Sequence, residues 1–152
     1  MKKHVENPPD EIAKAIQWGA GILGIPCDDI RVEFAMDEYA ENKAFLRGTK
    51  PFEIVLNMNP LAHLNRSNLT ETIFHELTHI AQILLGRLQL KTGYMLWFGR
   101  PIMTPESHRA YLSLPYEVEA RSYARELNRL YKLSLLGERR KFIAPNSSLK
   151  DT

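Results

Sequence analysis

Apolar residues recur along this chain at two different periods, and the changes of period mark the predicted elements. After the breaker cluster at residues 7–10, apolar and small residues return at helical spacing until Gly21 and Gly24, which predicts a helix over about residues 10–23. From Ile30 the pattern alternates at period two, and two more apolar runs follow it. Strands are therefore expected over residues 30–36, 43–49 and 52–58.

The next helical pattern carries its apolar residues on one stripe. Ile73, Leu77, Ile80 and Leu84 are spaced by four, three and four positions, as on the buried face of a helix. Asn68 with Glu71 three residues later is typical of a capping box, and Gly86 is a natural C-terminal stop. These signals predict a helix over about residues 68–85.

A last helical pattern follows an irregular segment. Residues 88–103 mix glycines and aromatic residues, which indicates an irregular hairpin or a large loop. Pro115 is typical of a first helical residue, and the apolar spacing continues from it to Leu136. Gly137 is expected to end this helix, and the polar residues 137–152 to form a frayed tail.

The order of the elements predicts the α+β class, with a small, mostly antiparallel sheet packed on the two long helices. The chain has 152 residues and is 44% hydrophobic, which fits a single domain spanning residues 1–152. Its net charge of +2 is too small to indicate nucleic acid or an anionic membrane as a partner. The lone Cys27 and the absence of a secretory or membrane-spanning pattern favour a soluble cytoplasmic protein.

The motif His75-Glu76-x-x-His79 is the strongest chemical signal in the chain. Positions i and i+4 lie one turn apart on a helix, so both imidazoles can reach one metal ion. Glu76 lies about 100° around the helix from His75, a position suited to a general base acting on water at the metal. The apolar stripe leaves the histidines on the flank of the helix. The competing interpretation is a chance pattern on a solvated helix face.

A catalytic zinc usually takes three protein ligands, so a third donor is required. The downstream candidates are Glu106, His108, Glu117 and Glu119. Glu117 and Glu119 are about 200° apart on a helix, so only one of them can face the metal. Glu117 is favoured because it shares its face with Ala120 and Ala124, which allow a close approach to the histidine helix.

With these two motifs the chain resembles the gluzincin metallopeptidases, including the membrane-bound prenyl-protein processing and ImmA/IrrE-type peptidases. FHELTHIAQ is similar to their first motif and PYEVEARSYA to their later glutamate helix, over about residues 52–127. The resemblance implies a minimal zincin-like domain, with Glu117 as the ligand and Glu119 as a bystander. Many of these relatives have Asp or Asn where this chain has Arg121. A hydrogen-bond acceptor for His75 or His79 is then expected elsewhere, from a backbone carbonyl or Asn57.

These observations predict a zinc-dependent endopeptidase that acts on a peptide or protein substrate, with Glu76 as the base. Donors to the tetrahedral oxyanion are sought among Tyr111, His108, Tyr116 and Tyr123. Tyr111 and His108 rank first because they directly precede the ligand helix. Two alternatives remain: a catalytically inactive zinc-binding interaction module, and a SprT-like DNA-associated protease with His108 as the third ligand.

Overall fold

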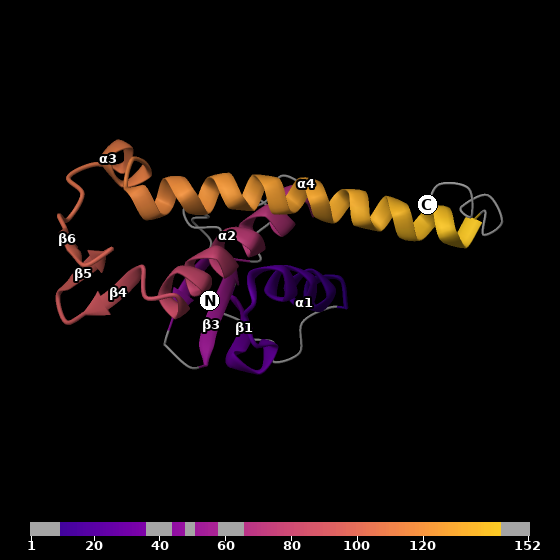
Figure 1. The fold of residues 1–152 in the computed structure, drawn as a ribbon, viewed down its shortest axis with the longest axis horizontal. Coiled ribbons are helices and arrows are strands. Elements are labelled where there is room, and N and C mark those ends of the chain that lie inside the picture. The colour runs from indigo at the N-terminus through magenta and orange to yellow at the C-terminus, as the bar shows by residue number, and fades with distance from the viewer. Residues whose placement is uncertain (1–9, 36–43, 48–50, 58–65, 144–152) are drawn as a thin grey trace.

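The computed structural model describes residues 10–35, 44–47, 51–57 and 66–143, which form an α+β fold (Figure 1). In chain order the elements are α1 (Asp10–Leu23), a 3₁₀ turn η1 (Cys27–Asp29), β1 (Ile30–Ala35), β2 (Ala44–Arg47), β3 (Phe52–Asn57), α2 (Arg66–Leu84), β4 (Leu88–Lys91), β5 (Tyr94–Trp97), β6 (Arg100–Ile102), α3 (His108–Leu112) and α4 (Pro115–Ile143). The order of helix, strands and two long helices predicted from the sequence is confirmed.

Within the described residues the strands form two three-stranded sheets, where one sheet was expected. In the first, β3 is central, parallel to β1 with Ile30 opposite Phe52 and antiparallel to β2 with Ala44 opposite Leu56. The central strand is buried over most of its length, at Phe52, Ile54, Val55 and Leu56. Three of the predicted strands are thus present, and their predicted outer ends at 36, 43, 48–49 and 58 lie outside the described residues.

The second sheet replaces the irregular segment expected at residues 88–103. It is an antiparallel meander in the order β4-β5-β6. The β5–β6 connection is a two-residue turn in which Phe98 (φ 51°) and Gly99 (φ 78°) both have positive φ, the geometry whose twist matches a hairpin. These strands have only three or four residues and are largely exposed, so their apolar alternation is too short to identify them.

The helix termini differ from the prediction at two places. α2 begins at Arg66, so Asn68 lies inside its first turn and not at the N-cap position that the sequence predicted. α4 continues through Gly137 to Ile143, because one glycine in a helix interior costs only about 1 kcal/mol and neighbouring turns sustain the helix. The predicted tail is therefore helical as far as residue 143. No helix in the described part of the chain is long and apolar enough to cross a membrane.

The core lies between α1, the first sheet, α2 and the middle of α4, which crosses α2 along one side of the molecule (Figure 1). Trp18 of α1, Phe74 of α2 and Tyr131 of α4 form a triangle of rings with centroids 5.1–5.6 Å apart. Gly19 lets α1 approach α2, since a Cβ there would lie 2.8 Å from Leu77 Cδ1. This packing fixes α2 on both sides and leaves one flank facing the start of α4.

Candidate metal centre

α2 presents two imidazoles on the flank that its buried stripe leaves open. Ile73, Leu77 and Ile80 are fully buried in the core. His75 and His79 lie one turn apart on the adjoining face, with ring centroids separated by 4.8 Å. Their Nε2 atoms are 3.1 Å apart, so both rings direct the same nitrogen at one point.

The first turn of α4 supplies a carboxylate at that point. Ala120 and Ala124 are buried where α4 packs against α2, and their small side chains let the two helices come close. The Glu117 carboxylate is buried and lies 3.1 Å from His75 Nε2 and 2.9 Å from His79 Nε2. The three potential ligand atoms fall within 4.8 Å of one another. Two imidazole nitrogens and one carboxylate oxygen are a donor set that fits zinc.

The charges of the three groups are coupled. Burial opposes ionisation of Glu117, but hydrogen bonds with His75 and His79 hold the pKa of this carboxyl well below its usual range. Burial lowers the pKa of His79, and its hydrogen bond and charge interaction with Glu117 outweigh that effect and raise the pKa above 6.5. The centre therefore keeps an ionised carboxylate, as a metal ligand must be.

Glu76 lies beside this cluster without belonging to it. Its side chain is 8% exposed, and burial is the main reason that its pKa is raised, with the charges of the two histidines acting in the opposite direction. A carboxylate with a raised pKa is better matched to proton transfer near neutral pH than an ordinary glutamate. Glu76 thus lies next to the three potential ligands and outside the group that they form.

The acceptor behind His79 is Gln82, which the sequence analysis missed. Gln82 is 1% exposed, and its Oε1 lies 2.8 Å from His79 Nδ1. The signal was present, because Gln82 is three residues after His79 and so on the same helix face. Asn57, the candidate proposed for this role, is the last residue of β3, and its side chain is not among those that the structure describes.

Glu119 and Arg121 form hydrogen bonds with residues other than the two histidines. Gln82 Nε2 donates to Glu119 Oε1 at 3.1 Å, so Glu119 is adjacent to the centre, but the described metal-ligand cluster contains Glu117 in its place. Arg121 Nη2 donates to the backbone carbonyl of Leu112 at the end of α3. Arg121 thus ties α4 to the preceding short helix.

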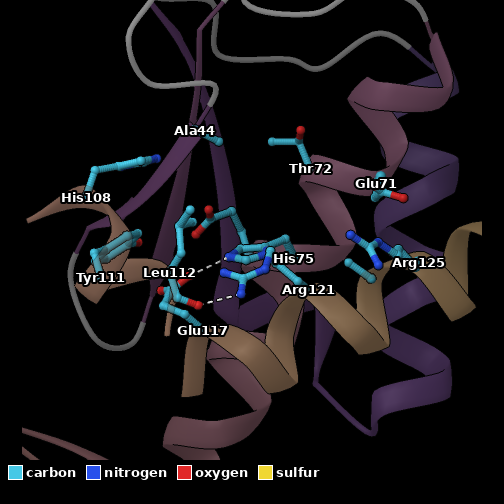
Figure 2. Close-up of a pocket in the computed structure, with 12 residues that line it drawn as sticks. Ala44, Glu71, Thr72, His75, His108, Tyr111, Leu112, Glu117, Arg121 and Arg125 are labelled. Carbon is cyan, nitrogen blue, oxygen red and sulfur yellow. Dashed lines mark hydrogen bonds and ion pairs between the residues drawn. The ribbon is translucent and has the colours of Figure 1, made fainter. Parts of the chain in front are cut away.

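A cleft of about 400 Å³ opens over the cluster (Figure 2). Its lining residues are Ala44, Glu71, Thr72, His75, Glu76, His108, Tyr111, Leu112, Glu117, Arg121, Ala124 and Arg125. Figure 2 shows His108 and Tyr111 on the wall formed by α3, facing Thr72 and Glu71 of α2 across the cleft. The other two candidate oxyanion donors, Tyr116 and Tyr123, do not line it.

Tyr111 and His108 stack on each other in the cleft wall, with ring centroids 6.3 Å apart and an interplanar angle of 23°. Burial and the nearby charge of Glu117, to which the phenol hydrogen-bonds, raise the pKa of Tyr111. The phenol is therefore protonated and able to donate throughout the physiological range. His108 lies in the wall and is not part of the described ligand cluster.

No protein-family model, curated protein or solved structure matches this chain. The resemblance to gluzincins remains a prediction carried by the two motifs. What the structure adds is that residues 42 positions apart in the chain, His75 and Glu117, are in contact beside a buried glutamate.

Proposed function

We propose that this protein is a zinc-dependent endopeptidase of minimal, zincin-like architecture. The observation that carries the proposal is the convergence of His75, His79 and Glu117 within 4.8 Å, beside a cleft that His75 and Glu117 line together with Glu76. Three protein ligands with access from a cleft are characteristic of catalytic zinc, whereas structural zinc sites are usually closed by four. A peptide or protein whose scissile bond enters this cleft is the proposed substrate class.

The zinc, when bound, supplies Lewis acidity that polarises the scissile carbonyl and lowers the pKa of water to about 7. Glu76 accepts a proton from the attacking water, whose oxygen forms a bond to the carbonyl carbon. As the carbon–nitrogen bond breaks, Glu76 gives that proton to the leaving amine. The products are a carboxylate and an amine, and the enzyme forms no covalent bond with the substrate.

Tyr111 is the proposed donor to the oxyanion of the tetrahedral intermediate. Its phenol lies in the cleft wall near Glu117, and its raised pKa keeps the proton on the oxygen. His108 stacks on this ring and orients it, and it is the second candidate donor. Both residues lie on α3, which Arg121 joins to α4 through the Leu112 carbonyl.

The cellular setting belongs to the same proposal. Cys27 is a free, exposed thiol, which suits a reducing compartment such as the cytoplasm. The net charge of +2 supports a peptide or protein substrate over nucleic acid. The SprT-like alternative needs His108 as a ligand, whereas Glu117 is the third member of the cluster found among the described residues.

The test is the substitution Glu76→Gln, which keeps the size of the side chain and removes the base. The purified variant is expected to retain zinc, measured by elemental analysis, and to lose at least about 10²-fold in peptide hydrolysis, followed by mass spectrometry on a peptide library. Glu71→Gln is the matched control, because Glu71 is on the same helix and lines the same cleft. Equal hydrolysis by wild type and Glu76→Gln would refute the mechanism. A zinc-loaded wild type that cleaves nothing would favour the inactive interaction module.

A further inference from the structure

Behind the metal-binding face, Gln82 connects His79 to α4. Its amide nitrogen lies 3.0 Å from the Tyr116 carbonyl and 3.1 Å from Glu119 Oε1. A carbonyl and an ionised carboxylate can only accept hydrogen bonds, so the group that faces them must be the NH₂ of the amide. The amide oxygen is therefore the atom that faces His79 Nδ1.

This orientation determines where the proton of His79 lies. An amide oxygen only accepts, so the contact of 2.8 Å from Gln82 Oε1 to His79 Nδ1 requires the proton on Nδ1. In the metal-free protein Nε2 faces the Glu117 carboxylate, which also only accepts, so the doubly protonated ring satisfies both contacts; a metal on Nε2 would replace that second proton and leave the proton on Nδ1. Nε2 is the atom that lies 3.1 Å from His75 Nε2 and 2.9 Å from the Glu117 carboxylate, at the centre of the ligand cluster.

We infer that Gln82 and Glu119 are positioning residues that hold His79 in the Nδ1–H tautomer, with Nε2 directed at the metal. The inference rests on the proposed metal centre and gives Glu119, which is not a ligand, a defined role. Glu119 and the Tyr116 carbonyl prevent the Gln82 amide from flipping, and the oriented amide prevents the imidazole from flipping.

Only an amide at position 82 satisfies all of these contacts. A glutamate there would accept from His79 but would face the Glu119 carboxylate with a second negative charge. A methionine of similar size would offer no strong acceptor to His79 and would leave the buried Tyr116 carbonyl without its donor. The position therefore requires an acceptor at one end and a donor at the other.

The outer end of this chain of contacts is weaker. Arg87 Nη1 lies 3.6 Å from Glu119 Oε1, and the two side chains are 40% and 26% exposed. Solvent screens an ion pair of this kind, so Arg87 contributes little to the orientation. Glu119 is therefore the outermost residue expected to affect the orientation of the His79 ring.

The first experiment determines the tautomer of His79 in protein without metal or substrate. Long-range proton–nitrogen NMR is recorded on zinc-free Glu117→Ala protein labelled with nitrogen-15 histidine, well above the range in which imidazoles titrate, so that no Glu117 carboxylate competes for a proton on His79 Nε2. With Gln82 in place this protein is expected to show His79 protonated at Nδ1, and adding Gln82→Met is expected to abolish this preference. Gln89→Met is the control, because the amide of Gln89 donates to the Gly86 carbonyl at the surface. Protonation of His79 at Nε2 with Gln82 in place would overturn the inference.

The second experiment measures zinc affinity by competition with a chelator. Gln82→Met is expected to bind zinc about 10- to 100-fold more weakly, the usual cost of removing a group that orients a ligand. The double variant Gln82→Glu with Glu119→Gln restores an acceptor for His79 but not the donor to the Tyr116 carbonyl, so it is expected to recover part of the loss. If Gln82→Met does not fold, the tautomer of the double variant is the deciding measurement. Protonation of its His79 at Nδ1 supports the inference, and protonation at Nε2 overturns it.

Neither readout uses peptide hydrolysis. A protein that shows His79 protonated at Nδ1 in a manner dependent on Gln82, but cleaves no peptide, would contradict the proposed function and leave the role of Gln82 and Glu119 intact. If the protein binds zinc and cleaves peptides, but Gln82→Met changes neither the tautomer of His79 nor the zinc affinity, only the role of Gln82 and Glu119 is contradicted.

Discussion

Gly19 is the position where a single methyl group is expected to disturb the support of the metal centre. An added Cβ would lie 2.8 Å from Leu77 Cδ1 and 2.9 Å from Phe74 Cδ1, whereas carbon atoms pack at about 3.5–4.0 Å. The ring of Phe74 cannot move aside freely, because it packs between Trp18 and Tyr131. Overpacking of this kind costs about 1–3 kcal/mol.

The same substitution also has a favourable contribution, since alanine in a helix is about 1 kcal/mol better than glycine. Gly21→Ala isolates that contribution, because a Cβ at Gly21 meets nothing within 4 Å in the described part of the chain and the residue lies in the same helix. Gly21→Ala is therefore expected to stabilise the fold by about 1 kcal/mol. Gly19→Ala should be less stable than Gly21→Ala by about 1–3 kcal/mol.

The assay is urea unfolding of the zinc-free variants, followed by far-ultraviolet circular dichroism. With a urea dependence of about 1–3 kcal/mol per molar, the two midpoints should differ by about 1 M. Zinc-free protein is used so that metal binding does not contribute to the measured free energy of unfolding. Equal midpoints for Gly19→Ala and Gly21→Ala would refute the close approach of α1 to α2 on which the reasoning depends.

Four further predictions concern the proposed centre itself. Glu117→Gln is expected to lose most of its zinc on dialysis while Glu119→Gln retains it, as measured by elemental analysis; the reverse result would exchange their roles. Zinc affinity should fall about tenfold per pH unit below the raised pKa of His79, because zinc must displace a proton there, and chelator competition across pH tests this. In the zinc-free protein the same proton stabilises the fold, fully below pH 6.5 and progressively less as the pH rises through the raised pKa, which urea unfolding at several pH values measures. Tyr111→Phe should lower kcat about 10²-fold with little change in KM, because the phenol is the proposed donor to the oxyanion, and an unchanged kcat in this variant would contradict that role.

The elements that the sequence predicted well are those with a long, regular pattern. The stripe through Ile73, Leu77 and Ile80 placed α2 in the core and its histidines on the open flank, because helical periodicity is local information. The position of Glu117 beside these histidines followed from the small residues that share its helix face. Both inferences depend on spacing within one helix.

The features that were missed depend on tertiary contacts or on short segments. Gln82 has the right spacing from His79, but its role appears only when α4 places two acceptors against its amide nitrogen. The end of α4 was misplaced because Gly137 predicts a stop, whereas the helix continues through it to Ile143. A single glycine costs a helix only about 1 kcal/mol, so it does not by itself end one when the turns on both sides continue.

The origin of the ligands in two helices also has a kinetic consequence. His75 and His79 are brought together as soon as one turn of α2 forms, which is a fast local event. Glu117 joins them only after a loop of 42 residues has closed and α4 has docked on α2. Tight zinc uptake should therefore coincide with that docking step, so that the rate of metal capture during refolding reports the assembly of the two helices.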